Sequence, residues 1–417
     1  MLDKIAPMPR LMLYTCAAHY RHVLGEILGR QMRQGEDVSV LERRIERHFD
    51  IGHAIAMPLA RVGIYATIKS LIKPGQEVIL SPYTIADVIN MVVCAGGVPV
   101  FADIDRETCN ISAAAVEALI TESTGAVLVT HFYGLMCDIE RIAAVCQAKG
   151  VPLVEDAAQS FEARQNGKPA GTFGVAGIYS FGMYKNVNAF FGGMVVTGDA
   201  DLAGRIRREI ADWPFQPADG YAKKVFSAIT IDGVTHPLFF RTLFFWLFRW
   251  AFLNNVDAIN NKLKIDIAPE LKHQLPESYK INMTPLQARL ILRQLDGVEA
   301  INQQRIAAAR RWHEGLSDIK DLILPPLRSD GSHVYWYFPI QYDRRHDLVA
   351  FAMRHCRDIT ESYHRNCAAL PCFAEFARSC PNAQATADSL IYLPAYPRYG
   401  ADEIDKTIKV IRAYFGK

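Results

Sequence analysis

Lys185 lies in the stretch SFGMYKN, five residues after Ser180 and shortly before a Gly-Gly pair. A second polar stretch, VEDAAQS, places Asp156 directly after an apolar run. A lysine amine condenses with an aldehyde, a carboxylate keeps a pyridine nitrogen protonated, and a hydroxyl binds a phosphate. Together these side chains meet the chemical requirements of pyridoxal phosphate. Taken singly, each has an ordinary alternative: an exposed loop lysine, a capping aspartate and a serine that ends a strand.

The elements that position these side chains follow from an alternation of short β-rich runs and helical stretches between Glu77 and Thr197. The runs with strand character are EVIL, PVFADI, GAVLVT, PLVEDA, GIYSF and MVVT, and amphipathic stretches such as DIERIAAVCQAKG separate the first four. This alternation predicts an α/β fold with helices on both faces of a mainly parallel central sheet. In such sheets ligands bind outside the carboxyl ends of the strands, where Asp156, Ser180 and His131 fall.

The chain is expected to have three parts. Residues 1–212 form a large cofactor-binding domain with an N-terminal arm, 213–279 an aromatic-rich insertion, and 280–417 a linker helix followed by a smaller C-terminal α/β domain. In TPLQ, Thr284 is the expected N-cap of a long helix, and Gln287 completes a capping box. Farther on, VYWYFPIQY predicts a strand and ADEIDKTIKVIRAYF a terminal amphipathic helix.

Composition limits the class of protein. The 417 residues are 50% hydrophobic and 22% charged with a net charge of +2, which is the profile of a soluble globular chain with a large core. This charge gives no bias toward nucleic acid, so no nucleic-acid partner is expected. The start, MLDKIAPMPRLMLYT, lacks the pattern of a secretory signal. We therefore expect a cytoplasmic protein, with peripheral attachment at the inner face of the membrane as an alternative.

The nine cysteines form no CxxC motif, and most stand singly in apolar context, which is typical of small core residues in a reducing compartment. Cys367, Cys372 and Cys380 lie near His364 in the sequence, but their irregular spacing matches no familiar zinc or iron–sulfur pattern. We expect unpaired thiols and no bound metal.

Several motifs in a fixed order resemble the DegT/DnrJ/StrS family of fold type I, pyridoxal-phosphate-dependent sugar aminotransferases. The motifs are GEDVSVLERRIERHF, PGQEVILSPYT, GGVPVFADIDRETCNI, HFYGLMCDIERI, VEDAAQS, GTFGVAGIYSFGMYKN and GGMVVTGD. The resemblance is dense from Gln31 to Asp199 and looser from Asn282 to Arg311 and around LPAYPRY. Motifs combined in this order are far more specific than any single one.

This resemblance implies roles by position. Lys185 is implied to be the lysine that forms the Schiff base, and Asp156 the partner of the pyridine nitrogen. Gln159 is implied to lie near the phenolic oxygen of the cofactor, and Ser180 to bind its phosphate. In that setting Lys185 moves a proton as general base and acid, which requires a lowered pKa of its amine.

Three positions depart from the family pattern. Where the family usually has a Ser-Gly-Thr-Ala phosphate cup, this chain has PLARVG. The backbone amides of Ala60 and Arg61 still suit a phosphate at a helix start, while the Arg61 side chain is either a direct contact or faces solvent. Relatives place an aromatic residue on the cofactor ring where this chain has Ile85. Relatives also reach the neighbouring subunit's cofactor with an Asn-aromatic-Arg-Met run, here KINM, which makes Lys280 the candidate for that contact.

The resemblance implies an aminotransferase that moves an amino group from an amino acid, glutamate in the family, to a keto-sugar on a nucleotide or lipid carrier. A homodimer is implied because the neighbouring chain completes sites of this fold type. Some relatives carry histidine in place of the Schiff-base lysine and perform a dehydration, so the presence of Lys185 favours transamination. Two alternatives stay open: a pyridoxal-phosphate-dependent dehydratase or lyase, and a non-catalytic regulator with an altered cup and Ile85. The sequence does not identify the acceptor.

The insertion contains the most aromatic part of the chain, HPLFFRTLFFWLFRWAFLNN. It is too short and too charged for a transmembrane helix. In one interpretation, residues 237–254 form an interfacial helix that contacts a membrane or covers a lipid-linked substrate. In the other, the helix is buried in the core or in a dimer interface.

Overall fold

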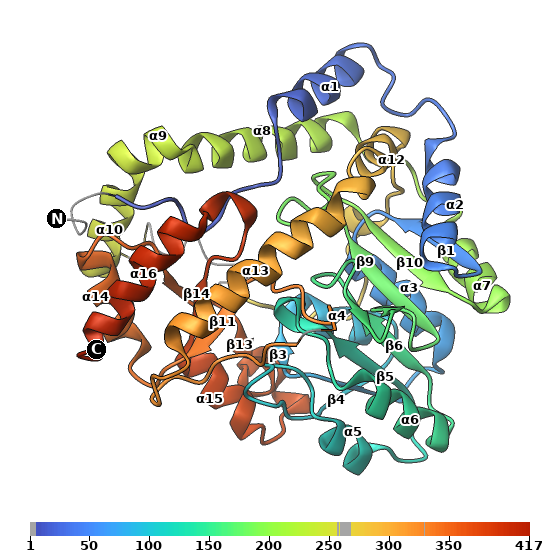
Figure 1. The fold of residues 1–417 in the computed structure, drawn as a ribbon. Helices are drawn as coiled ribbons and strands as arrows, with labels where there is room; N and C mark the ends of the chain where they lie inside the picture. The colour runs from blue at the N-terminus through green and yellow to red at the C-terminus, as the bar shows by residue number, and fades with distance from the viewer. Residues whose placement is uncertain (1–5, 257, 259–267, 329) are drawn as a thin grey trace.

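The computed structural model describes residues 6–256, 258, 268–328 and 330–417 (Figure 1). Its centre is a seven-stranded sheet in the order β1-β10-β9-β6-β5-β2-β4. Strand β10 is antiparallel to both neighbours, and the strands from β9 to β4 are parallel, which confirms the expected mainly parallel sheet. The strand bounds are β1 His53–Met57, β2 Glu77–Leu80, β4 Val98–Phe101, β5 Thr124–Thr130, β6 Leu153–Asp156, β9 Ala176–Ser180 and β10 Gly193–Thr197.

Helices cover both faces of this sheet, as expected. Side chains alternate along each strand, so that Val78 and Leu80 of β2 join one apolar cluster while Ile79 joins the other. The first face is covered by α3 (Ala60–Leu71), α4 (Ala86–Cys94) and α7 (Ala200–Ile210). The second face is covered by α2 (Asp37–Phe49), α5 (Ala113–Leu119) and α6 (Ile139–Lys149). The carboxyl ends of the central strands stay uncovered by these helices and form the edge at which the site is built.

The C-terminal part forms a smaller α/β unit around a three-stranded antiparallel sheet in the order β11-β14-β12. Its strands are β11 Phe338–Gln341, β12 Thr360–Glu361 and β14 Leu390–Leu393. Its helices are α13 Val298–Leu316, α14 Arg345–Arg354, α15 Pro381–Ser389 and α16 Ala401–Tyr414. Helix α16 packs against both α13 and α14, and it matches the predicted terminal helix.

A short ribbon joins the small sheet to the large domain. β3 (Tyr83–Thr84) pairs antiparallel with β13 (Arg365–Asn366), and the amide of Cys367 donates a hydrogen bond of 2.8 Å to the carbonyl of Pro82. The ribbon brings the ring of His364 to 6.0 Å from that of Tyr83. Residues of the small domain are thereby held at the edge of the large one. A separate hairpin consists of β7 (Arg164–Gln165) and β8 (Lys168–Pro169).

The capping box of the linker helix is present, but the expected long helix is interrupted. α12 (Pro285–Leu292) begins with the Thr284 and Gln287 side chains bonded to each other's backbone, and it packs against α2. The side-chain amide of Gln294 then donates 2.6 Å to the carbonyl of Leu290, the acceptor that a continuing helix would give to the backbone of Gln294. A glycine, Gly297, follows before α13 begins. The prediction of one helix was therefore wrong at this point.

The predicted strand VYWYFPIQY is shorter than expected. Only Phe338–Gln341 pairs within the small sheet. Tyr335 has a φ of 47°, and the amides of Val334 and Trp336 donate to the carbonyls of Gly134 and Tyr133 at 2.8 and 2.7 Å. The first half of this segment thus binds to a corner of the large domain instead of extending the strand.

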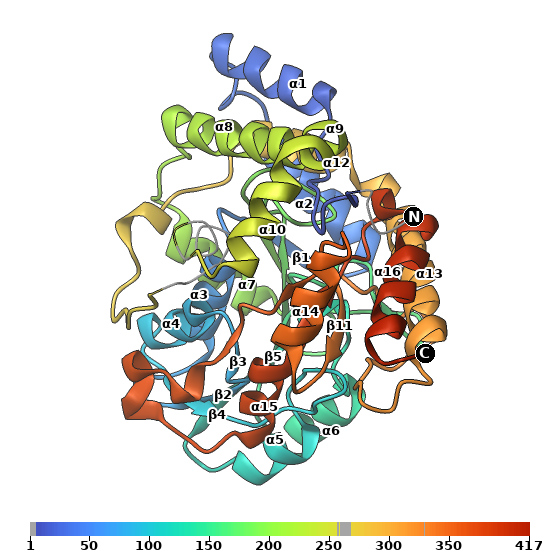
Figure 2. The same ribbon diagram turned by 90° about the vertical axis from the view of Figure 1, so that its left-hand side faces the viewer.

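The aromatic insertion is helical and lies along the small domain. It consists of α8 (Ala218–Thr235), α9 (Pro237–Phe239), a π-helical turn (Phe240–Phe244) and α10 (Phe245–Leu253). α8 crosses the top of the molecule beside α1 (Ala17–Leu28), and α9 and α10 descend at the edge farthest from the large sheet (Figures 1 and 2). α10 packs against α14. In the part of the chain described by the structure, no helix has both the length and the apolar character needed to cross a membrane.

The Gly-Gly pair that follows Lys185 in the sequence has a packing role. Residue Gly192 forms a bridge with Leu59, which places the start of β10 against the start of α3. A Cβ atom on Gly193 would lie 2.6 Å from the amide nitrogen of Ala60. Because the obstructing atoms are backbone, only glycine allows this approach.

We predict that Gly193→Ala forces α3 away from β10 and lowers the free energy of unfolding by about 1–3 kcal/mol, the usual cost of overpacking. Urea unfolding followed by circular dichroism measures this change. Gly198→Ala is the matched control, because a Cβ at Gly198, near the other end of the strand, meets no atom within 4 Å. Equal stability of the two variants would contradict the packing role.

Candidate active site

Lys185 lies in the loop between β9 and β10, at the carboxyl end of the sheet. The loop is closed at its base by a hydrogen bond of 2.9 Å from the amide of Phe181 to the carbonyl of Gly192. A second hydrogen bond of 2.9 Å, from the amide of Ala189 to the carbonyl of Phe181, joins the two sides of the loop. The amide of Lys185 itself donates 2.9 Å to Gly182 in a tight turn. The backbone from which the Lys185 side chain extends is therefore held by hydrogen bonds.

Trp336, from the segment before β11, covers the amine. The Nζ atom of Lys185 lies 4.5 Å from the centre of the Trp336 ring, and the indole N–H donates 3.0 Å to the carbonyl of Tyr184. The ring is buried. This cover keeps water from the amine while its π face still attracts the charged form.

Asp156 ends β6 in the strand next to β9, so its carboxylate stands at the same sheet edge as Lys185. Burial raises the pKa of Asp156, an effect opposed by the amide of Ala158, which donates 3.0 Å to Oδ1, and by the charge of Lys185. Asp156 is 5% exposed. Both charged groups are thus removed from water, and each stabilises the ionised form of the other.

The pKa of the Lys185 amine is lowered to about 8. Burial is the main cause, and the positive charges of Arg305 and Arg61 add to it, while Asp156 acts in the opposite direction. An amine with this pKa is partly neutral near physiological pH and can both accept and return a proton. The lowered pKa that the sequence required of Lys185 is therefore present.

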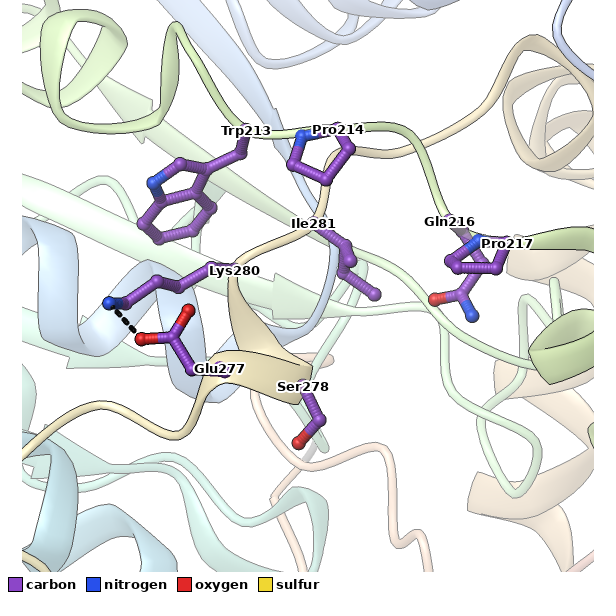
Figure 3. Close-up of a pocket in the computed structure, with 8 residues that line it drawn as sticks. All are labelled: Trp213, Pro214, Gln216, Pro217, Glu277, Ser278, Lys280 and Ile281. Carbon is purple, nitrogen blue, oxygen red and sulfur yellow. Dashed lines mark hydrogen bonds and ion pairs between the residues drawn. The ribbon is translucent and has the colours of Figure 1, made fainter.

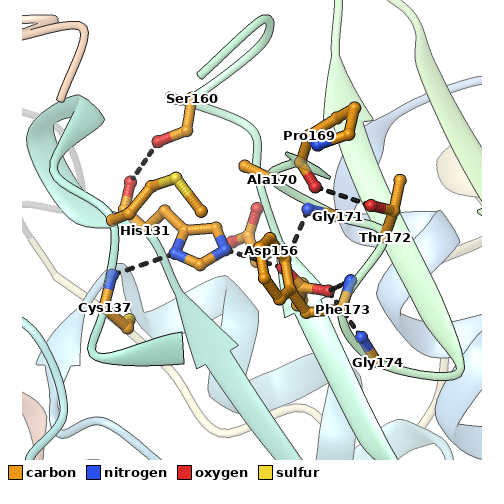
Figure 4. A network of polar contacts seen from close by, with 12 residues as sticks. His131, Cys137, Asp156, Ser160, Pro169, Ala170, Gly171, Thr172, Phe173 and Gly174 are labelled. Carbon is orange, nitrogen blue, oxygen red and sulfur yellow. Dashed lines mark hydrogen bonds and ion pairs between the residues drawn. The ribbon is translucent and has the colours of Figure 1, made fainter. Parts of the chain in front are cut away.

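A buried network stands directly beneath Asp156 (Figure 4). The carboxylate of Glu155, the preceding residue, accepts hydrogen bonds from the amides of Gly171, Phe173 and Gly174 at 2.8, 2.6 and 2.7 Å. It also accepts a bond of 3.0 Å from Nε2 of His131. Because the amide of Cys137 donates 3.2 Å to Nδ1 of this ring, the proton is on Nε2. The sequence placed His131 at a strand end but gave no sign of Glu155, since its role depends on a loop 16 to 19 residues later.

Gln159 and Ser180, the other predicted cofactor contacts, lie at the same edge. Oε1 of Gln159 accepts a bond of 2.6 Å from the amide of Tyr133. Oγ of Ser180, at the end of β9, accepts a longer bond of 3.4 Å from the amide of Gly182. Gln159 is held in place by its side-chain oxygen.

The altered phosphate cup forms the first turn of α3. The helix starts at Ala60 without a side-chain cap, so its first N–H groups have no partner within the helix. The Arg61 side chain forms an ion pair with Asp87 and donates 3.1 Å to the hydroxyl of Tyr279. Asp87 is also paired with Lys272 at 2.5 Å. Arg61 therefore does not simply face solvent. Its guanidinium is already paired with Asp87 and Tyr279, so a phosphate would share it with these two side chains.

Ile85 and Lys280 line two different cavities. Ile85 precedes α4 and lines a small cavity together with His364. Lys280 lies in a different pocket, about 500 Å³ in volume, beside Trp213 and 2.6 Å from the carboxylate of Glu277 (Figure 3). Among the described residues, Lys280 contacts Glu277 and lines this pocket, and its role at a neighbouring subunit stays a prediction.

A polar cluster that the sequence did not predict lies where the two domains meet. Its members are Tyr83, Tyr133, Ser362, His364 and Tyr392. The hydroxyl of Tyr133 is 2.9 Å from that of Tyr83 and 3.1 Å from that of Tyr392. Burial, followed by the charge of Lys185, lowers the pKa of His364 to about 3, so this ring is neutral. Tyr133 lies in the HFYGL motif, but nothing in the sequence linked it to His364.

Comparison with known proteins now identifies the family. The sequence profile of the DegT/DnrJ/EryC1/StrS aminotransferase family matches residues 18–221 and 263–412. The chain belongs to this family. Its members are aminotransferases that depend on pyridoxal phosphate, as the motif order implied. The match leaves out residues 222–262, which include most of α8 and all of α9 and α10.

Relatives with described roles agree with this family. The spore coat polysaccharide biosynthesis protein SpsC of Bacillus subtilis is 28% identical over 397 residues, covering 91% of this chain and 90% of that protein. Helicobacter pylori PseC, an aminotransferase involved in the biosynthesis of pseudoaminic acid, has the same fold, with a TM-score of 0.74 at 16% identity over 99% and 98% of the two chains. An E. coli GDP-4-keto-6-deoxy-D-mannose-3-dehydratase with bound hydrated PLP gives a TM-score of 0.75 at 18% identity over 98% and 100%.

The electrostatics of Lys185 predict how its reactivity depends on pH. In cofactor-free protein, the rate at which an acylating reagent modifies Lys185 should rise with a midpoint near pH 8. In Asp156→Asn the midpoint should move to lower pH, because the negative charge that favours the protonated amine is removed. Mass spectrometry of the Lys185 peptide measures both curves. Asp212→Asn, an exposed site, is the control, and an unchanged midpoint in Asp156→Asn would show that the carboxylate does not act on the amine.

Proposed function

We propose that this protein is a pyridoxal-phosphate-dependent aminotransferase that moves an amino group from glutamate to a keto-sugar carried on a nucleotide or a lipid. The observation that carries the proposal is the Lys185 amine, buried beside Asp156 with its pKa lowered to about 8. The family and the printed roles of the relatives support an aminotransferase acting on sugars. The donor and the carrier rest on resemblance.

The residues present fit the cofactor. Asp156 and Ser180 end adjacent strands, and Lys185 follows in the next loop, so an acid, a hydroxyl and an amine share one edge. The first turn of α3, at Ala60, offers backbone N–H groups to a phosphate without any side chain. Gln159 would lie beside the ring oxygen. Ile85 would give the ring an apolar face without aromatic stacking.

When bound, the cofactor supplies an electron sink for the carbon that loses its proton. The chain would supply the proton movements: Lys185 would take the proton from the donor Cα and deliver it to the C4′ carbon of the cofactor, which its pKa near 8 allows. Asp156 would keep the pyridine nitrogen protonated. Trp336 and the neutral His364 exclude water on the side of the small domain.

Arg305 is our candidate for the donor carboxylate. It is 2% exposed, and its guanidinium donates to the hydroxyl of Tyr14 and, at 3.4 Å, to the carbonyl of Tyr335, the residue before Trp336. One turn earlier on α13, Asn302 accepts 2.7 Å from Asn186, the neighbour of Lys185. Within the described ranges no carboxylate pairs with Arg305, so a substrate carboxylate would provide the missing negative charge.

A homodimer and a cytoplasmic location are part of this proposal, with Lys280 reaching the cofactor of the neighbouring subunit. A dehydratase has a similar fold, but dehydration in this family is associated with histidine in place of the lysine, and Lys185 is present. A purely regulatory role would leave the lowered pKa of Lys185 without use.

The central test is Lys185→Ala. With glutamate, a keto-sugar acceptor and pyridoxal phosphate, we expect the wild type to form 2-oxoglutarate in step with aminated sugar, and the variant to lose at least about 10³-fold in rate. The variant should also lose the visible absorbance band of the lysine–cofactor bond. Lys320→Ala, an exposed lysine, should change neither. A band that persists in Lys185→Ala would refute the assignment, and turnover without 2-oxoglutarate would favour the dehydratase or lyase.

For Arg305, we predict that Arg305→Gln raises the KM for glutamate roughly 10- to 100-fold, the range for loss of charge-assisted hydrogen bonds, with little effect on the KM for the keto-sugar. Steady-state kinetics with each substrate varied in turn separate the two. Arg310→Gln, exposed on the same helix, is the control. An equal rise in both KM values would indicate a structural role only.

A further inference from the structure

The helical segment 237–253, named here the aromatic hairpin arm, lies outside the part of the chain that matches the family profile. It follows α8 and consists of α9, the π-helical turn and α10. The three pieces form one helical run along the small domain, in contact with α8 and α14 (Figure 2). Its role is therefore not explained by the chemistry common to the family.

The two arginines of the arm bind to the small domain on its inward face. Phe240 and Phe245 are buried in the core that extends into the small domain. Arg241 pairs with Glu403 of α16 at 3.3 Å, and Nε of Arg249 donates 2.9 Å to the carbonyl of Met353 at the end of α14. Both arginines thus bind the protein, which leaves the opposite face to the apolar residues.

The outward face is apolar along its whole length. Its large side chains are 39–60% exposed: Leu238, Phe239, Leu243, Trp246, Leu247 and Trp250. Thr242, the polar residue between them, turns its hydroxyl back to the carbonyl of Leu238 at 2.8 Å, and the indole N–H of Trp246 donates 3.0 Å to the carbonyl of Arg241. The face therefore offers water apolar surface where a surface helix normally carries its polar residues.

The segment that carries this face has charged side chains of one sign. The sequence from Gly233 to Val256 contains no Asp or Glu. Arg249 is stacked 5.6 Å over the ring of Trp246 and donates to the carbonyl of Met353, the residue before the exposed Arg354, which forms no ion pair with any described residue. Exposed leucines and tryptophans bordered by arginine, with no acid, match the composition of helices that lie in the interface of anionic bilayers.

We infer that the aromatic hairpin arm docks the protein on the surface of an anionic lipid bilayer, with Leu238, Leu243 and Trp250 inserted among the lipids and Arg354 facing the headgroups. The arm lies in the plane of the membrane, since no described helix is able to span it. This docking is independent of the proposed transamination, because the arm contributes no residue to the candidate active site. It binds lipid in the same way whether the acceptor sugar is carried on a nucleotide or on a lipid.

The test uses the full chain and vesicles of phosphatidylcholine with about 30% phosphatidylglycerol. In sedimentation, we expect the wild type to pellet with the vesicles and Leu238→Glu/Leu243→Glu to lose at least about tenfold in bound fraction. Leu24→Glu/Leu28→Glu adds the same charges at exposed leucines of α1 and should bind as the wild type does. The double variant of the arm keeps Trp246 and Trp250 as reporters, whose fluorescence brominated lipids should quench in the wild type alone.

Three results would overturn the inference. One is equal vesicle binding by wild type and the arm variant, and another is binding lost equally in the α1 control. The third is a molecular mass by light scattering that halves in the arm variant while vesicles bind neither protein, which would assign the face to a second copy of the chain. Unchanged transaminase activity of the arm variant without vesicles shows that it is folded, and it keeps this test separate from that of Lys185.

Discussion

The site depends on keeping one amine and one carboxylate out of water at the end of a sheet. Lys185 and Asp156 are both desolvated, and the attraction between their opposite charges reduces the cost. That requirement explains features on several levels. The adjacent strands β6 and β9 set the spacing of the two groups, the closed loop after β9 fixes the lysine backbone, and the Glu155–His131 network anchors the strand end from below.

Much of the architecture was readable from the sequence because it rests on local patterns. The alternation of apolar runs fixed the central strands, and TPLQ marked the start of α12. The failures occur where a distant contact overrides a local preference. The side chain of Gln294 forms hydrogen bonds with the carbonyl of Leu290 and with the backbone of Asn188. The amide of Trp336 donates to the carbonyl of Tyr133 instead of to a neighbouring strand. The contacts with Asn188 and Tyr133 join segments more than one hundred residues apart.

The same reasoning explains the uneven result for the site. Lys185, Asp156 and Ser180 come from adjacent elements with chemistry visible in their type. Trp336, His364 and Arg305 come from the small domain, where composition gave no reason to select them. The departures from the family pattern also have local compensation: Arg61 is balanced by Asp87, which is joined by Lys272 and Tyr279 from the end of the predicted insertion. Arg61 therefore has matching partners around the phosphate cup, while the backbone of the cup still forms the start of α3.

Tyr133 and Gly134 form a corner of the large domain that binds the segment before β11. Both residues have positive φ, 58° and 77°, and a Cβ on Gly134 would lie 2.7 Å from the amide of Trp336, so the two domains meet there without slack. The same short segment carries the ring that covers Lys185. Any tilt of the small domain that lifts this ring admits water to the amine and restores its affinity for a proton. The packing at this corner therefore helps to set the pKa of Lys185, although the corner lies in a different part of the chain.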